Sequence, residues 1–500
     1  MKKRLLLTFI ALSLAVLSCR TLLPGPALDP TPLPALPTQP VSTPIPSPRP
    51  TFQPAPTDSI PTEIAGAGAD TLNDPYYPQM GNGGYDALHY TLDLTVDLDN
   101  NQISGSTTLD AQATEALSSF NLDLHGLDVS AVTVDNLPAT FSRQDDELTI
   151  TPAAPFAKDQ SFTVSIAYSG RPQPVEDIFF PDETVGWFAD AGVYVLSESA
   201  GAMSWYPVNN HPLDKASYTF RITAPKQYVV ATNGLMKSEV VKGEMKTTVW
   251  EETHPMASYL ATLAIGHYKL FTETGPNGLP IHNYFPPEAG GEITSAFSRT
   301  SEMIAYYSQV FGPYPFESYG AVVVPLELEF ALENQTLSVF SYDMVDEITV
   351  AHELAHQWFG NSVSLRSWEN IWLNEGFATY AEALWVEHTE GKAAGDDYMR
   401  DIYAKARAKN MAAPGNPEAR HLFDDFVYYR GACVLHALRL KVGDELFFKI
   451  LHEYYARYQY GNASTDDFIA VAQSVSGQDL QAFFTDWLFS AEIPPLPQPG

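Results

Sequence analysis

Hydrophobic and polar residues alternate over much of the first half of the chain. In residues 90–98, YTLDLTVDL, every second position is apolar. Alternate residues of a β-strand face opposite sides of a sheet, so this period of two predicts half-buried strands. The same period recurs in later runs separated by turn residues, namely 147–151, 161–166, 218–223 and 227–231. We therefore expect residues 79–268 to form an N-terminal β domain, an antiparallel sandwich of short strands.

The period changes to that of helices in the second half of the chain. Residues 297–310 carry apolar side chains at helical spacing, and a Gly-Pro stop signal follows them. A short apolar run at 320–324 predicts a buried strand, and amphipathic helices are expected between residues 394 and 488. Residues 269–492 are thus predicted to form a second, mainly helical domain. The chain as a whole has the pattern of a multidomain α+β fold.

The N-terminus has the pattern of a targeting segment rather than of a folded element. Residues 2–4 are basic, residues 5–17 are apolar but too few to span a bilayer comfortably, and Cys19 follows Ser18. This pattern resembles a bacterial lipobox, and the alternative is an ordinary signal peptide with an incidental cysteine. We interpret residues 1–19 as a lipoprotein signal peptide. It predicts an extracytoplasmic protein, anchored to the bacterial cell membrane through lipid on Cys19.

Residues 20–78 are dominated by Pro, Thr, Ala and Ser. A segment of this composition buries too little apolar surface to fold. Its prolines favour extended backbone, which makes it a semi-rigid spacer. We therefore predict a disordered tether that holds the folded domains away from the membrane surface.

Composition limits the partners. The chain has 28 basic and 60 acidic residues, a net charge of -32. This charge excludes nucleic acid and an anionic membrane surface as main partners, so membrane contact is expected through the N-terminal lipid only. Cys433 is the second of two cysteines and lies in an apolar helical run. It has no disulfide partner once Cys19 is lipidated, so we expect a buried thiol.

The candidate chemistry is concentrated in residues 352–356, HELAH, and in Glu375. Two histidines four apart lie on one face of a helix and can bind one metal ion, with Glu353 between them. Glu375 follows far enough along for a second helix to supply a third ligand. Three protein ligands leave a fourth position open, which is typical of catalytic zinc. We expect one Zn²⁺ per chain, bound by His352, His356 and Glu375, in a zinc hydrolase.

The alternative is a polar helix with two surface histidines. The residues on both sides of the motif, 348–351 and 358–359, are apolar, so the helix is expected to be buried. A buried charged cluster is costly unless it is paired or bound to a metal. The sequence around Glu375, WLNEGFA at 372–378, is also apolar, and this favours the metal site.

Six motifs in the same order resemble the gluzincin zinc aminopeptidases of the aminopeptidase N and leukotriene-hydrolase type. They are WYP to DKA at 205–216, FGPYPF at 311–316, VVVP at 322–325, HELAHQWFGN at 352–361, WLNEGFA at 372–378 and YYRG at 428–431. The resemblance covers residues 85–490. It implies a saddle-like N-terminal β domain and a thermolysin-like catalytic domain. The family's C-terminal helical domain is not expected in this chain.

The resemblance also implies roles for single residues. The family's Gly-x-Met-Glu-Asn strand corresponds to FALEN at 330–334. Ala331, Glu333 and Asn334 are therefore expected to bind substrate, with Glu333 binding its free α-amine. The alternative for Glu333 is a solvated strand residue. Phe330 replaces the family's glycine, which lets a substrate backbone approach closely, so we expect Phe330 to narrow or reshape the subsites nearby.

Three further residues are candidates. Glu198 resembles a second acidic residue that the family uses for the amine. Tyr428 has the register of the family's catalytic tyrosine in the YYRG motif, and the alternative is that Tyr429 takes this role or that both pack in the core. Glu382 lies seven residues after Glu375, on roughly the same helical face, and is a candidate to support a ligand histidine. A plain surface acid is the alternative for Glu382.

These residues predict a zinc-dependent aminopeptidase that acts on peptides with a free N-terminus. Zinc lowers the pKa of bound water. Glu353 is expected to take the proton and deliver it to the leaving amine, and Tyr428 to donate a hydrogen bond to the oxyanion. The alternatives are another hydrolase specificity, endopeptidase or epoxide hydrolase, and a non-catalytic binding protein on the same fold. The complete set of ligands, base and tyrosine disfavours the last.

Overall fold

The computed structural model describes residues 65–178, 180–190, 192–327 and 329–498, which lie in one compact unit. The predicted signal peptide at 1–19, with Cys19, lies outside the described residues, as does the predicted tether up to residue 64. Both stay predictions, as do the exact domain boundaries.

The end of the predicted tether is folded, which corrects the sequence prediction for residues 65–78. Strand β1 (Gly66–Ala67) pairs with β4 (Leu117–Asp123). Tyr76 and Tyr77 are buried, and the Asp74 carboxylate accepts hydrogen bonds from their backbone N–H groups at 2.8 and 3.3 Å. The two aromatic side chains bury the apolar surface that the rest of this segment lacks.

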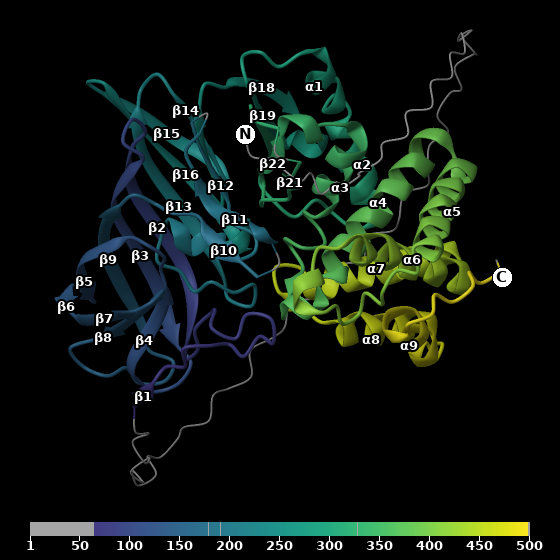
Figure 1. The fold of residues 1–500 in the computed structure, drawn as a ribbon, viewed down its shortest axis with the longest axis horizontal. Coiled ribbons are helices and arrows are strands. Elements are labelled where there is room, and N and C mark those ends of the chain that lie inside the picture. The colour runs from purple at the N-terminus through teal and green to yellow at the C-terminus, as the bar shows by residue number, and fades with distance from the viewer. Residues whose placement is uncertain (1–64, 179, 191, 328, 499–500) are drawn as a thin grey trace, which may run out of the picture. The chain divides into compact units, whose positions relative to one another are not determined.

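One sheet of the N-terminal domain contains most of the alternating runs (Figure 1). Its strand order is β15 (Leu235–Lys242), β16 (Met245–Ala257), β13 (Lys215–Pro225), β2 (Tyr85–Asp97), β3 (Gln102–Ala113), β9 (Ser161–Gly170), β5 (Asp128–Val134) and β6 (Leu137–Pro138). The predicted alternation is confirmed in β2, where Tyr90, Leu92, Leu94 and Val96 are buried and the residues between them are more exposed.

Two features of this sheet differ from the predicted sandwich of short antiparallel strands. Strands β2 and β16 have 13 residues each. Strand β13 runs parallel to β2, with a register from Ser217 opposite His89 to Thr223 opposite Thr95, and its other neighbour is antiparallel. Parallel neighbours need a long connection, which the strands between β2 and β13 provide. The local period of two carries no information about strand direction.

Two smaller sheets belong to the same domain. One has the order β1, β4, β8 (Glu147–Thr151) and β7 (Thr140–Gln144). The other has the order β10 (Val175–Asp177), β11 (Phe180–Phe188), β12 (Val193–Leu196), β17 (Leu263–Gly266) and β14 (Val229–Thr232). Strand β12 leads directly to Glu198, so this sheet positions the first candidate residue of the site.

The second domain combines a sheet with helices (Figure 1). The sheet order is β18 (Lys269–Thr274), β19 (Pro280–Phe285), β20 (Tyr319–Val324), β22 (Ser338–Ser341) and the edge strand β21 (Ala331–Leu332). The helices are α1 (Gly291–Ala296), α2 (Thr300–Val310), α3 (Glu347–Ala355), α4 (Trp372–Glu390), α5 (Lys392–Ala408), α6 (Asp425–Val442), α7 (Asp444–Tyr458), α8 (Thr465–Ser476) and α9 (Gln481–Phe489). β23 (Ser364–Leu365) and β24 (Asn462–Ala463) pair separately.

The predicted strand at 320–324 and the predicted C-terminal helices are present, but the helix predicted at 297–310 begins later. Helix α2 starts at Thr300. The Phe297 carbonyl accepts hydrogen bonds from the Thr300 N–H at 3.2 Å and from the Thr300 hydroxyl at 2.7 Å. This closed turn separates α2 from α1, because it takes up a carbonyl that a continuous helix would use.

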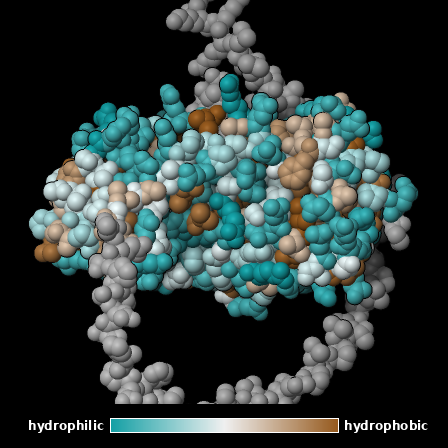
Figure 2. All heavy atoms as spheres, turned by 90° about the horizontal axis from the view of Figure 1, so that it is seen from below, coloured by the Kyte–Doolittle hydropathy of each residue, from teal (hydrophilic) through white to brown (hydrophobic). Residues whose placement is uncertain are grey.

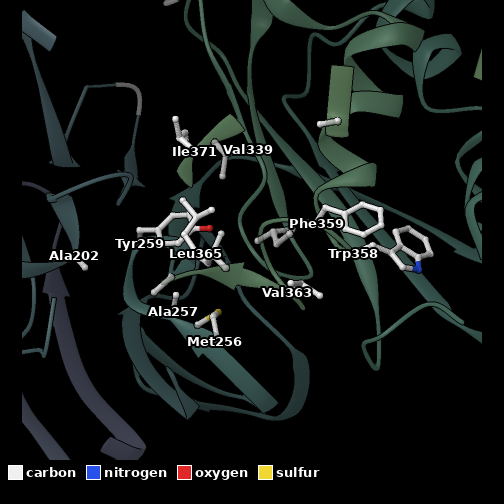
Figure 3. Close-up of a cluster of buried hydrophobic side chains, with 14 of the residues drawn as sticks. Ala202, Met256, Ala257, Tyr259, Val339, Trp358, Phe359, Val363, Leu365 and Ile371 are labelled. Carbon is white, nitrogen blue, oxygen red and sulfur yellow. The ribbon is translucent and has the colours of Figure 1, made fainter. Parts of the chain in front are cut away.

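The hydrophobic core continues from one domain into the other. Figure 3 shows part of it, including Met256, Ala257 and Tyr259 of the first domain and Trp358, Phe359 and Val363 of the second. The Tyr259 hydroxyl donates to the Gly360 carbonyl at 3.0 Å. The ammonium group of the half-buried Lys215 donates to the carbonyls of Asn361 and Ser362 at 2.8 and 3.1 Å. The turn that follows α3 is thereby fixed to the β domain.

The surface fits the acidic composition. The face in Figure 2 is mostly hydrophilic, with hydrophobic side chains scattered over it. Within the described ranges, none of the helices combines the length and the hydropathy needed to cross a membrane. Cys433 is buried, as predicted, and burial raises the pKa of its thiol to about 12.

Candidate active site

Both histidines of the HELAH motif lie at the end of helix α3. The N-cap of the helix is Asp346, whose side chain accepts hydrogen bonds from the N–H groups of Ile348 and Thr349 at 2.8 and 3.0 Å. This N-cap fixes the start of the helix and therefore its register. His352 and His356 are then one turn apart on one face, with ring centroids separated by 4.8 Å.

Glu375, in the first turn of α4, completes a group of three ligands. Its Oε2 lies 3.3 Å from His352 Nε2 and 3.5 Å from His356 Nε2. Ligand atoms of a tetrahedral zinc site lie about 3.4 Å apart, because each bond to zinc is about 2.1 Å long. Burial alone would raise the pKa of Glu375, but His356 and His352 lower it to about 2. The residues present therefore fit zinc in spacing, type and charge.

The other ring nitrogens fix the orientation of the two histidines. His352 Nδ1 lies 2.7 Å from Glu382 Oε1, and His356 Nδ1 lies 3.1 Å from the Phe359 carbonyl. With the Nδ1 proton donated to these oxygens, each Nε2 would offer its lone pair to a metal ion bound beside Glu375. Of the two alternatives for Glu382, support of a ligand histidine is therefore the one that the structure favours.

Tyr398 of α5 was not found from the sequence. Its hydroxyl donates to the second carboxylate oxygen of Glu382 at 2.6 Å. The hydrogen bonds thus continue from His352 through Glu382 to Tyr398. No local pattern marks Tyr398, because its contact with Glu382 depends on how α5 packs against α4.

Glu353 is buried next to the ligand group. One of its carboxylate oxygens and ligand atoms of Glu333 and His356 lie within 4.8 Å of one another. Burial raises the pKa of Glu353 to about 8. A carboxyl group whose pKa lies near neutrality is suited to accept a proton and to release it again.

Glu198 and Glu333 come together from the two domains. Carboxylate oxygens of Glu198, Glu333 and Glu375 lie within 4.8 Å of one another. Oε1 of Glu198 and Oε1 of Glu333 are buried and have no hydrogen-bond partner among the described residues. Burial and the neighbouring Glu333 raise the pKa of Glu198 well above its usual range. Buried carboxylates are costly unless a cation pairs with them, so this arrangement favours binding of a cation.

The backbone at Glu333 and Asn334 is fixed by side chains. The Glu333 carbonyl accepts hydrogen bonds from Gln357 Nε2 at 3.0 Å and from Asn361 Nδ2 at 2.7 Å. Asn334 Nδ2 donates to the Leu260 carbonyl at 3.2 Å. Since Gln357 and Asn361 lie within the five residues that follow the HELAH motif, one hydrogen-bond network connects the Glu333 backbone to the segment that carries the metal ligands.

The other residues of the FALEN motif lie on the edge of the sheet. Ala331 is half-buried in β21, whose one neighbour among the described strands is β22. The N–H of Phe330 donates to Ser341 Oγ at 3.1 Å, and its carbonyl accepts from the Ser341 N–H at 2.9 Å. The Phe330 side chain packs, half-buried, against the core. Its effect on substrate subsites stays a prediction.

Tyr428, and not Tyr429, lies at the ligand group. The Tyr428 ring stacks on the His352 ring with centroids 6.1 Å apart. Burial and the carboxylate of Glu375 raise the pKa of Tyr428 well above its usual range, so its hydroxyl remains a hydrogen-bond donor. The Tyr429 ring instead lies under the Lys405 ammonium, 3.9 Å from the ring centroid. The geometry therefore favours Tyr428 as the candidate.

Comparison with known proteins agrees with this geometry. The Peptidase M1 N-terminal domain matches residues 86–260, and the Peptidase family M1 domain matches residues 295–487. An M1 zinc metallopeptidase from Deinococcus radiodurans has 32% identical residues and superposes with a TM-score of 0.80, over 86% of this chain and 99% of that one. The chain belongs to peptidase family M1. The fold class and the resemblance to zinc aminopeptidases that the sequence predicted are thus confirmed.

Further matches are a second structure of that metallopeptidase and two longer aminopeptidases. A mutant of the same Deinococcus metallopeptidase, bound to a Tyr-Ser-Ala substrate, has a TM-score of 0.81 and 31% identity. Aminopeptidase M1-D of Oryza sativa subsp. japonica is 29% identical over 58% of this chain and 36% of its own length. Glutamyl aminopeptidase of Sus scrofa is 24% identical over 82% of this chain and 48% of its own length. The chain thus spans about a third to a half of these curated relatives.

Proposed function

We propose that this M1 family member is a zinc-dependent aminopeptidase that removes the first residue from peptides with a free N-terminus. The observation that carries the proposal is the pair of buried carboxylates, Glu198 and Glu333, beside the ligand group. Their Oε1 atoms have no hydrogen-bond partner among the described residues, and they lie close to Glu375. A peptide's α-ammonium group supplies the cation and the hydrogen-bond donors that these oxygens need.

The ligand group supports hydrolysis of the bond next to that amine. His352, His356 and Glu375 would hold the metal, and zinc in such a site supplies Lewis-acid polarisation of a carbonyl and acidifies water. Glu353 takes a proton from the attacking water and passes it to the leaving nitrogen. Tyr428 donates a hydrogen bond to the oxyanion that develops on the former carbonyl, a contribution of about 3 kcal/mol for a single donor.

The amine-side carboxylates also explain why the cut falls at the first peptide bond. An ammonium group held by Glu198 and Glu333 places the adjacent carbonyl at the ligand group, since the carboxylate oxygens of Glu198, Glu333 and Glu375 lie within 4.8 Å of one another. An internal peptide segment has no charge at this position and leaves two buried carboxylates unpaired. That penalty disfavours endopeptidase activity.

The test compares aminoacyl arylamides with the same compounds blocked by N-acetylation, using the zinc-loaded full chain. We expect cleavage of the free-amine substrates alone, its loss in Glu353→Ala, and a large rise in KM in Glu333→Ala. Equal cleavage of the acetylated compounds would contradict amine binding by Glu333 and would favour an endopeptidase. Cleavage of neither, at full zinc content, would favour the epoxide-hydrolase or binding-protein alternative.

We also propose that the protein is a lipoprotein held outside the cytoplasm by lipid on Cys19. The support is the sequence alone, a basic start, an apolar stretch and Cys19 after Ser18. Expression of the full chain in a bacterium fed a labelled fatty acid tests it. We expect label in the membrane fraction from the natural chain and none from Cys19→Ser, and equal labelling of both would contradict the proposal.

A further inference from the structure

Three hydrogen-bonded side chains, Tyr77, Asp177 and Ser199, lie next to Glu198. Ser199, the next residue, donates from Oγ to Asp177 Oδ2 at 2.7 Å. The Tyr77 hydroxyl lies 2.8 and 2.9 Å from the two oxygens of the same carboxylate and also contacts Ser199 Oγ. Tyr77, Asp177 and Ser199 are each at most 6% exposed. Two hydroxyl donors therefore face one buried acceptor, an arrangement that holds all three side chains in place.

Tyr77 belongs to a segment that precedes the region matched by the M1 N-terminal domain, which begins at residue 86. The segment is fixed to both domains. Asp74 lies 3.2 Å from His211 Nε2 of the first domain and accepts a hydrogen bond from the Trp368 N–H of the second at 2.9 Å. The Tyr77 ring meets the Trp368 ring edge to face at 5.9 Å. This packing gives Tyr77 a fixed position from which it can order the residues that it contacts.

We propose that Tyr77, Asp177 and Ser199 are positioning residues that hold Glu198 in place for the α-ammonium group of the substrate. The inference rests on the proposed function, because it requires that Glu198 binds an amine. Oε1 of Glu198 has no hydrogen-bond partner among the described residues. The residues on both sides of Glu198 fix its backbone. Ser199 is tied to Asp177 and Tyr77, and Ser197 Oγ donates to the Ala261 carbonyl at 2.6 Å.

Tyr77, Asp177 and Ser199 also affect the electrostatic environment of the amine that Glu198 would bind. Asp177 is a third buried acid, and its charge acts on Glu198. Its negative charge strengthens the attraction for a cation. The hydroxyl groups of Tyr77 and Ser199 occupy the Asp177 carboxylate, so Asp177 does not compete with Glu198 for the ammonium protons.

The test uses Tyr77→Phe in the zinc-loaded full chain, with two metal-binding ligands that differ in the amine. Leucine hydroxamate carries an α-amine, and acetohydroxamic acid does not. We expect the dissociation constant for leucine hydroxamate, measured by calorimetry, and the KM for leucine arylamide to rise about fivefold to tenfold, the effect of about one lost hydrogen bond. The affinity for acetohydroxamic acid and kcat are expected to change less than about twofold.

Tyr76→Phe is the matched control. It removes a hydroxyl from the neighbouring residue, which donates to Asn416 Oδ1 at 3.1 Å and to the Pro417 carbonyl and is expected to leave both affinities unchanged. Ser199→Ala is expected to act in the same direction as Tyr77→Phe. An unchanged affinity for leucine hydroxamate in both Tyr77→Phe and Ser199→Ala would overturn the inference, and so would equal losses for the two hydroxamates. A natural protein that cleaves no free-amine substrate would instead refute the proposed function.

Discussion

A close backbone contact near the site, between two glycines, gives a quantitative prediction for Gly376→Ala. Gly376 follows Glu375 on α4, and Gly431 follows Tyr428 by three residues on α6. A Cβ atom at Gly376 would lie 2.9 Å from both Cα and the carbonyl carbon of Gly431. The absence of side chains at this crossing therefore sets how closely Tyr428 approaches the metal ligands.

The expected losses of stability and of kcat in Gly376→Ala follow from this 2.9 Å distance. Carbon atoms in contact lie about 3.5–4.0 Å apart, so the alanine methyl group would force the helices apart by roughly 0.6–1 Å. Overpacking of this kind costs about 1–3 kcal/mol, and alanine's better helix propensity offsets up to about 1 kcal/mol of it. We expect a net loss of about 1–2 kcal/mol. Since a misplacement of about 1 Å can cost a hundredfold in rate, kcat should fall about tenfold to a hundredfold.

Thermal unfolding measures the loss of stability, and arylamide hydrolysis measures the fall in kcat. Zinc content is determined for each preparation. Gly291→Ala is the control, because Gly291 has an ordinary φ angle and an alanine methyl group there would meet no atom within 4 Å. It is expected to behave like the natural protein. A Gly376→Ala variant with unchanged Tm and kcat would refute the reasoning, since the helices would then have room for the methyl group.

Two other predictions concern the supporting residues. Glu382→Ala, which removes the partner of His352 Nδ1, should raise the zinc dissociation constant about 10- to 100-fold in a chelator competition, and unchanged affinity would contradict this role of Glu382. The carboxylates of Glu252 and Glu317, with oxygens 3.7 and 2.7 Å from His254 Nδ1, raise the pKa of His254 to about 9 from 6.5. This interaction stabilises the folded protein fully below pH 6.5, the pKa of the unfolded histidine, and its contribution is lost as pH rises through about 9, the pKa in the folded protein. His254→Gln should therefore lower the free energy of unfolding by about 1–2 kcal/mol at pH 6, after a discount for solvent screening. Near pH 10 it should cost almost nothing. Urea unfolding at both pH values tests it, and a pH-independent cost would contradict the assignment.

The sequence predicted the parts of the site that local spacing determines. The HELAH register places His352 and His356 on one face of a helix, and Glu375 follows on the next helix. Glu198 required the family resemblance, because it meets Glu333 only through the contact between two domains. Asp177 and Tyr398 carry no local signal, and their roles emerge from packing between distant segments. Tyr77 was hidden for another reason, since it lies at the end of a proline-rich stretch whose average composition predicts disorder.

In the fold, too, local sequence patterns predicted the burial of side chains but not the pairing of distant strands. Alternation in residues 90–98 predicted which side chains of β2 are buried. It did not predict that β13 lies parallel to β2, because strand direction depends on the path of the chain between them.

A zinc titration of the metal-free protein tests the central claim most directly. The chain is stripped with a chelator, zinc is added in steps, and bound metal and hydrolysis of a free-amine arylamide are measured on the same samples. We expect activity to rise linearly with bound zinc and to level off at about one equivalent, the number that a single three-ligand site holds, and Glu375→Ala to bind weakly and remain inactive. Full activity in the metal-free chain, or in Glu375→Ala, would contradict the account.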